Sequence, residues 1–66
     1  MSTAKVIEIS AESSKGFEDA IESGLSRAGE TVENIQSAWI KDQVVLLDNG
    51  KITGYRVHMH VTFKLK

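Results

Sequence analysis

Two histidines lie two residues apart near the end of this chain, in a stretch that alternates polar and apolar side chains. On a β-strand, residues at positions i and i+2 point to the same face, so His58 and His60 would present their imidazoles together. Two imidazoles at this spacing could share a transition metal. A metal site needs a third ligand, and the neighbouring sequence provides no evident one. The alternative for this pair is a solvated or interface face of the strand.

Trp39 and Arg56 are the other side chains suited to recognising a ligand. Trp39 is the only tryptophan. A large aromatic on an outer sheet face either covers a subunit interface or stacks on a planar ligand. The planar guanidinium of Arg56 could stack on a ring or bind a phosphate through two hydrogen bonds, or it could form a surface ion pair.

Motifs of catalysis are absent from the sequence. No serine lies in a G-x-S-x-G elbow, no glycine-rich phosphate loop occurs, and neither histidine belongs to a recognisable nucleophile motif. The nine carboxylates are spread along the chain, without the spacing of an EF-hand loop. They are either solvated or part of a site assembled across subunits. We therefore expect a protein that is not an enzyme.

Length and composition limit the classes that remain. With 66 residues, the chain forms a single domain (1–66), too small to bury a large core. It has no cysteine, so oligomerisation is the stabilising device left to it. A net charge of −1 predicts no nucleic-acid or membrane partner, and no apolar run approaches a membrane span. Residues 1–5 lack the apolar core of a signal peptide, and we expect a cytoplasmic protein.

The chain opens with a short predicted strand and one predicted helix. Residues 5–9 are rich in β-branched side chains and favour a strand, and residues 10–15 predict a polar loop in which Ser13 or Ser14 caps the helix. The helix is predicted to end at Gly29. Its apolar stripe consists of Phe17, Ala20, Ile21, Gly24, Leu25 and Ala28. Gly24 within this stripe indicates close packing of the helix against the sheet.

Two long strands joined by a tight turn follow the helix. Residues 35–48 predict the second strand, and Asn49-Gly50 favours the positive φ angles of a type I′ hairpin turn. Residues 55–66 alternate without a fault between an apolar face and a face of basic, histidine and threonine side chains. The order of elements is therefore β-α-β-β.

A two-residue turn predicts which residues of the hairpin lie opposite each other. Asp48 would pair with Lys51, and three further pairs follow by counting outward: Trp39 with His60, Lys41 with His58, and Gln43 with Arg56. The face away from the helix would then carry Ser37, Trp39, Lys41 and Gln43. The face toward the helix would carry Ala38, Ile40, Val44 and Leu46. The alternation fails at residues 44–47, where a β-bulge would reverse these assignments.

The predicted fold is α+β, a β-α-β-β protomer whose three-stranded, mainly antiparallel sheet wraps around one helix. We expect the first strand to lie beside the last one, so that the helix makes a right-handed crossover to the second strand. At about 3.3 Å per residue the last strand spans about 40 Å, while the helix covers about half of that length. The uncovered apolar face and the open strand edges indicate self-association.

These features together resemble the dodecin family over almost the whole chain. The resemblance rests on the β-α-β-β order, on residues 17–27 followed by Glu-Thr-Val-Glu-Asn at 30–34, on the pair Asp42-Gln43, and on the strand from Tyr55 through Phe63 and Leu65. It implies a homododecamer, a hollow sphere of tetrahedral symmetry. It also implies storage or sequestration of flavin (FMN or riboflavin), stacked in pairs between tryptophans at subunit interfaces.

The sequence departs from the flavin-binding dodecins at two positions. Ser37 occupies the slot of the stacking tryptophan, five residues before Asp42, and Arg56 occupies the slot of a glutamine that bonds the flavin ring. Trp39 lies two residues beyond the expected slot. The segments around residues 51–56 and 61–64 look more like those of the mycobacterial calcium-binding dodecins, which also lack this tryptophan.

The resemblance thus implies two ligands for a non-enzymatic shell of identical subunits. The first is flavin, held in an interface pocket by Ser37, Trp39, Asp42, Gln43 and Arg56. Trp39 would stack on the ring, Arg56 would bind the ring edge or a phosphate, and Asp42 and Gln43 would form hydrogen bonds. The alternative is a flavin-free assembly that binds Ca²⁺ between subunits or is purely structural.

Overall fold

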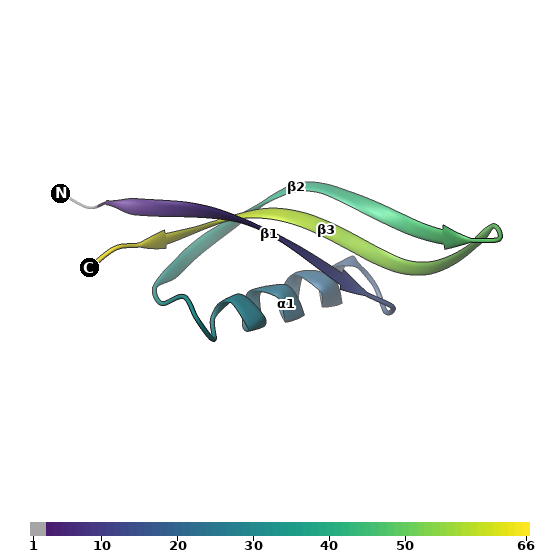
Figure 1. Cartoon of the computed structure of the whole chain (residues 1–66), viewed down its shortest axis with the longest axis horizontal. Coiled ribbons are helices and arrows are strands. Elements are labelled where there is room, and N and C mark those ends of the chain that lie inside the picture. The colour runs from purple at the N-terminus through teal and green to yellow at the C-terminus, as the bar shows by residue number, and fades with distance from the viewer. Residues whose placement is uncertain (1–2) are drawn as a thin grey trace.

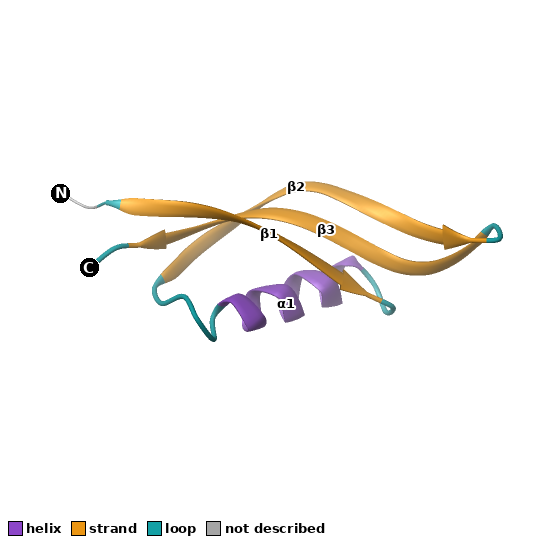
Figure 2. Cartoon of the chain, viewed as in Figure 1, coloured by secondary structure: helices purple, strands orange, loops and turns teal. Residues whose placement is uncertain are grey.

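The computed structural model describes residues 3–66 as one helix packed under one three-stranded sheet (Figures 1 and 2). Met1 and Ser2, part of the stretch inspected for a signal peptide, lie outside the described residues. The elements are β1 (Ala4–Ser13), α1 (Phe17–Ala28), β2 (Ile35–Asp48) and β3 (Lys51–Lys64). The predicted β-α-β-β order and the α+β class are confirmed. In the part of the chain that the structure describes, α1 has neither the length nor the apolar character to cross a membrane.

The sheet has the strand order β1-β3-β2, and β3 pairs antiparallel with both neighbours. The expected position of the first strand beside the last one is therefore confirmed. Its predicted extent is wrong, because β1 continues through residues 10–13, where we expected a loop. These residues pair with residues 55–58 of β3, and the hydrogen-bonded ladder outweighs the polar composition of the segment.

Helix α1 begins and ends where its apolar stripe does, from Phe17 to Ala28, followed by Gly29. The predicted serine cap is wrong, because Gly16 is the N-cap residue and no side chain caps the helix. The Ser13 hydroxyl instead donates a 2.6 Å hydrogen bond to the Asp19 carboxylate. The acidic residues Glu18 and Asp19 in the first turn still favour the helix through its dipole.

The core lies where α1 crosses the middle of β3. Ala20 of the helix and Val57, Met59 and Val61 of β3 are fully buried. Gly24 permits the close approach predicted from its place in the stripe: a β-carbon at this position would lie 2.7 Å from Ala11 Cβ. The edges of this small core are partly buried apolar side chains, among them Ile9, Ile21, Leu25, Ala38 and Ile40.

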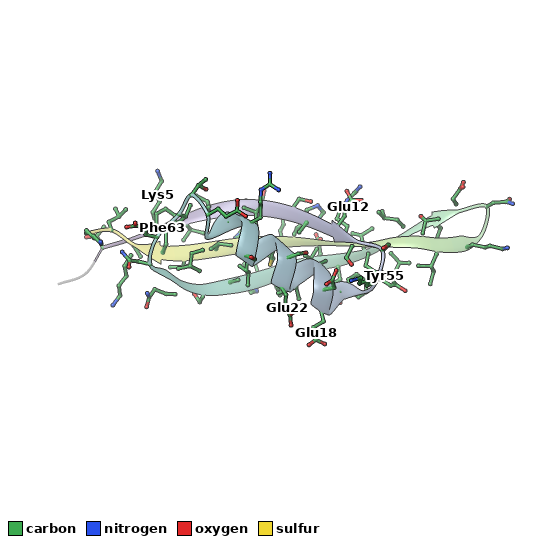
Figure 3. All side chains as sticks on the ribbon, turned by 90° about the horizontal axis from the view of Figure 1, so that it is seen from below. Lys5, Glu12, Glu18, Glu22, Tyr55 and Phe63 are labelled. Atoms are coloured by element: carbon green, nitrogen blue, oxygen red, sulfur yellow. The ribbon has the colours of Figure 1, made fainter. Side chains whose placement is uncertain are left out.

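The β2–β3 hairpin extends well past α1 and past the end of β1 (Figures 1 and 3). Its turn has positive φ angles at Asn49 (52°) and Gly50 (77°), as a type I′ turn requires. We call residues 44–52 the hairpin arm. Its exposed apolar side chains are Val44, Val45, Leu47 and Ile52. As predicted, the two long strands extend beyond the part of the sheet that α1 covers, and four large apolar side chains of the arm stay exposed.

Candidate functional site

The candidate site is the sheet face opposite α1, which we call the outer face. Its members are fixed by the pairing of β3 with its neighbours, because directly opposed residues lie on the same face of a sheet. The outer face of β3 carries Arg56, His58 and His60. The alternate residues Val57, Met59 and Val61 face α1 and form the core. This separation of the two faces was predicted from the alternation and is confirmed.

Trp39 lies opposite His60, as predicted, near the middle of the outer face. Their rings meet edge to face, with centroids 5.0 Å apart and planes inclined at 75°. The indole remains 62% exposed, although its residue type is among the best suited to burial at interfaces. The exposed ring is therefore available to stack against a ligand or another subunit.

The predicted pairing beyond Trp39 is wrong. Asp42, and not Lys41, lies opposite His58, and Gln43 lies opposite Val57 instead of Arg56. The cause is a β-bulge: the ladder passes from Ile40 directly to Asp42, and Lys41 is the extra residue. One inserted residue reverses the parity of every following residue on β2.

Two consequences follow for the predicted faces. Gln43 shares the helix-facing side with Val57, so it does not join Trp39, Asp42 and Arg56 on the outer face. Val44 and Leu46, predicted to face the helix, lie opposite Arg56 and Gly54 on the other side. A further irregularity, between Leu46 and Leu47, then restores the predicted pairing of Asp48 with Lys51. We anticipated a bulge within residues 44–47, but no pattern in the sequence indicated the one at Lys41.

Cross-strand pairs of opposite charge connect all three strands on the outer face. His60 Nε2 lies 2.8 Å from a carboxylate oxygen of Glu8 on β1, and Lys41 Nζ on β2 lies 3.5 Å from the same oxygen. The hydrogen bond from His60 and then the charge of Lys41 hold the pKa of the Glu8 carboxyl below its ordinary value. Glu8 thus joins β1 to both strands of the hairpin.

The next two rungs carry further pairs. His58 Nδ1 lies 2.5 Å from Asp42 Oδ1, and Arg56 donates a 3.1 Å hydrogen bond to the Glu12 carboxylate. Figure 3 labels Glu12 beside β1, on the other side of the view from Glu18 of α1. The guanidinium of Arg56 is therefore oriented by a carboxylate and, at 37% exposure of its side chain, still reachable from solvent. Arg56 thus forms a surface ion pair of the kind given as its alternative role, while its role toward a ligand stays a prediction.

The predicted ligand residues are thus divided between two faces. Ser37, Trp39, Asp42 and Arg56 lie on the outer face along two neighbouring strands, and Gln43 does not. Sequence reasoning did not single out Glu8, although it lay within the predicted strand, and it missed Glu12 because that strand was predicted to end at residue 9. If the alternation of β1 had been continued alongside that of β3, both carboxylates would have been placed on the same sheet face as the basic and histidine side chains of β3.

Within one chain the two histidines have different carboxylate partners. Each is engaged with a different carboxylate, His58 with Asp42 and His60 with Glu8. Among residues 3–66, no group of three or more histidine, aspartate or glutamate side chains is placed to hold a metal ion. This pairing is compatible with the alternative of a solvated or interface face of the strand.

Comparison with known proteins identifies relatives along the whole chain. The chain is 37% identical to calcium dodecin of Mycobacterium tuberculosis (strain ATCC 25618 / H37Rv), covering 100% of this chain and 93% of that protein. It superposes on the dodecin from Streptomyces davaonensis with a TM-score of 0.93 and 31% identity, covering 98% of this chain and 96% of that one. It also superposes on calcium dodecin from M. tuberculosis, whose structure is described as having a novel calcium-binding site, with a TM-score of 0.84 and 34% identity over 97% and 91% of the two chains. The family model Dodecin matches residues 3–66, and the chain belongs to the dodecin family.

Proposed function

We propose that this protein is a non-enzymatic, self-assembling shell that binds and stores a small planar ligand on the outer face of its sheet. The observation that carries the proposal is the 62% exposed indole of Trp39, surrounded by charged and hydrogen-bonding side chains. A planar ligand would stack on this ring, while polar groups beside the ring bind its edge. The absence of a nucleophile–base motif supports a binding role over catalysis, and we place this role in the cytoplasm.

Self-assembly is supported by what a single chain leaves uncovered. Only four of its described residues form the fully buried core, while the hairpin arm exposes Leu47 at 62% and Ile52 at 56%. Apolar surface of this kind is covered in stable small proteins by further copies of the chain. Family membership supports a homododecamer. Light scattering should give about twelve times the 7.3 kDa of one chain, and a stable folded monomer would contradict the proposal.

Flavin is the ligand that family resemblance favours for this face. Trp39 would stack on the isoalloxazine ring, Arg56 would bind a ring edge or the phosphate of FMN, and Ser37 and Asp42 would form hydrogen bonds. Gln43, on the opposite face of its own sheet, would reach such a ligand only from a neighbouring subunit. The ring would lie two residues further along β2, toward the hairpin turn, than in relatives that carry tryptophan in the slot of Ser37.

Titration of riboflavin and FMN with the assembled protein tests this ligand. Stacking on an indole quenches flavin fluorescence, so we expect saturable quenching in the micromolar range. Bovine serum albumin at equal mass concentration is the control for non-specific association. Unchanged flavin fluorescence at high protein concentration would contradict flavin binding while leaving the assembly untouched.

Calcium binding is the second candidate, favoured by the 37% identity to a calcium dodecin along the whole chain. The outer-face carboxylates Glu8, Glu12 and Asp42 are each paired with a cationic or histidine side chain, so they are poorly placed to bind Ca²⁺. A calcium site would therefore be assembled from other carboxylates of neighbouring subunits. EDTA should then lower the thermal midpoint and added Ca²⁺ should restore it, with Mg²⁺ as the control. An unchanged midpoint would contradict calcium binding.

A further inference from the structure

The two histidine–carboxylate pairs give the surface around Trp39 an unusual charge balance. Between the Trp39–His60 rung and the Val44–Arg56 rung, the outer face carries three carboxylates and two permanent cations. They are Glu8 and Glu12 from β1, Lys41 and Asp42 from β2, and Arg56 from β3. With both histidines neutral the formal charge of this surface is −1, and with both protonated it is +1.

Protonation of the two histidines is therefore enough to change the sign of the formal charge of this surface. Histidine is the side chain whose charge ordinarily changes between pH 5 and 8. Ser10 of β1 faces His58 from the side opposite Asp42, and Thr62 and Lys64 continue the same face of β3. Helix α1 packs on the other side of the sheet, against Met59 and Ala11. The charge of the surface beside Trp39 is therefore governed by His58 and His60 together.

From this arrangement we propose that His58 and His60 determine the charge of the ligand that the Trp39 surface accepts. With both imidazoles neutral the surface does not favour an anionic group, and with both protonated it selects planar aromatic ligands that carry one. The inference rests on the proposed planar-ligand site and adds a specificity to it. Both imidazoles act as specificity-determining residues at the edge of the stacking position.

Geometry links each histidine to this role. His60 contacts the indole edge-on, so a charge on its ring is adjacent to any ligand stacked on Trp39. His58 lies two residues along the same strand and on the same face. The carboxylates Glu8 and Asp42 keep the two imidazoles in place in either protonation state, because each accepts a hydrogen bond from the ring. A change in pH would then alter charge without rearranging the surface.

A pair of planar probes that differ in charge tests the proposal without relying on flavin. Pyrene-1-sulfonate stays anionic throughout the pH range, and pyrene-1-methanol is its neutral counterpart. Binding of each probe is followed by quenching of Trp39 emission at pH 8.0 and at pH 5.5. We expect the affinity for the sulfonate to rise about three- to tenfold at the lower pH, the size of a Coulomb interaction of one anion with two charges at partly solvated distances. The affinity for the neutral probe should change less than about twofold by the same reasoning.

Variants separate the histidines from the other cations of the surface. In the double variant His58→Gln/His60→Gln the affinity for the sulfonate should be the same at both pH values. Arg56→Gln is the matched control, because it should weaken sulfonate binding equally at both values and preserve the rise. Light scattering at both pH values confirms that each variant has the same assembly state.

Each outcome decides the proposal. A rise shared by both probes, a rise that persists in the double variant, or failure of both probes to bind would overturn it. Flavin binding without any pH-dependent preference for the sulfonate would overturn the specificity and leave the proposed function standing. A histidine-dependent preference without flavin binding would support the specificity and reject flavin as the ligand.

Discussion

Gly24 of α1 lies against Ala11 of β1 with no room for a side chain between them. A β-carbon at Gly24 would come within 2.7 Å of Ala11 Cβ and 3.1 Å of Met59 Cε. The contact joins the helix to the edge strand and to the centre of the core at one point. Glycine is a poor helix former, so its presence in mid-helix reflects this packing.

Replacing Gly24 by alanine should therefore destabilise the protein. The gain in helix propensity is about 1 kcal/mol, whereas overpacking costs about 1–3 kcal/mol, and the absence of space should make the second term dominate. Chemical denaturation at a fixed protomer concentration measures the change. Gly29→Ala is the control, because a β-carbon there meets only ordinary contacts at 3.4 Å or more. A more stable Gly24→Ala variant would show that α1 can move away from β1 at little cost.

Trp39→Ala should abolish flavin quenching while changing the free energy of unfolding of the protomer fold by less than about 0.5 kcal/mol, as expected for an exposed site. The reason is that Trp39 is 62% exposed and contributes little to the core. Trp39→Phe retains an aromatic face and should keep weaker binding. Fluorescence titration together with denaturation separates the two effects. Undiminished quenching in the alanine variant would place the flavin elsewhere.

Glu8 should make the stability of the protein sensitive to acid. Its pKa is lowered in the folded state, first by the hydrogen bond from His60 and then by the charge of Lys41. A lowered carboxyl pKa contributes stability above the ordinary value of 4.5, and the contribution is lost as pH falls through the folded-state value. In Glu8→Gln the stability deficit relative to the parent protein should therefore be present at pH 6 and shrink toward pH 3.

Thermal midpoints measured across this range test the effect of Glu8. Glu22→Gln, at an exposed position of α1, is the control and should have the same thermal midpoint as the parent protein at each pH. Because Glu8 is solvent-exposed, high salt should reduce the deficit at pH 6. A deficit that is constant from pH 3 to pH 6 would show that the carboxylate charge is not what stabilises the pairing.

Leu47 and Ile52 oppose each other on the hairpin arm and should be needed for assembly. They are exposed at 62% and 56%, so polar replacements cost the isolated protomer little. The double variant Leu47→Ser/Ile52→Ser should lower the assembly mass measured by light scattering, because the arm loses the apolar surface that another copy would cover. Leu47→Met/Ile52→Leu keeps the surface apolar and should assemble normally. A serine variant of unchanged mass would exclude the arm from the interfaces.

Much of the architecture follows from local signals in the sequence. The stripe from Phe17 to Ala28 predicts the helix with its observed bounds, and β2 was predicted with its observed bounds of Ile35 and Asp48. The Asn49-Gly50 turn and the alternation of β3 predict the hairpin and its two faces. These signals are local, because periodicity and turn preference depend on neighbouring residues alone.

The composition of the outer face was decided only by tertiary pairing. The bulge at Lys41 places Asp42 beside His58 and turns Gln43 to the other face, and a ladder of period two transmits that single insertion along the strand. The last residues of β1 form a strand because they pair with β3. This pairing places Glu12 within hydrogen-bonding distance of Arg56. Sequence alone thus determined which elements form and which residues are polar. Pairing between strands that are far apart in the sequence determined which of those polar residues contact each other. The register of two strands depends on the hydrogen bonds between them and cannot be read from either strand alone.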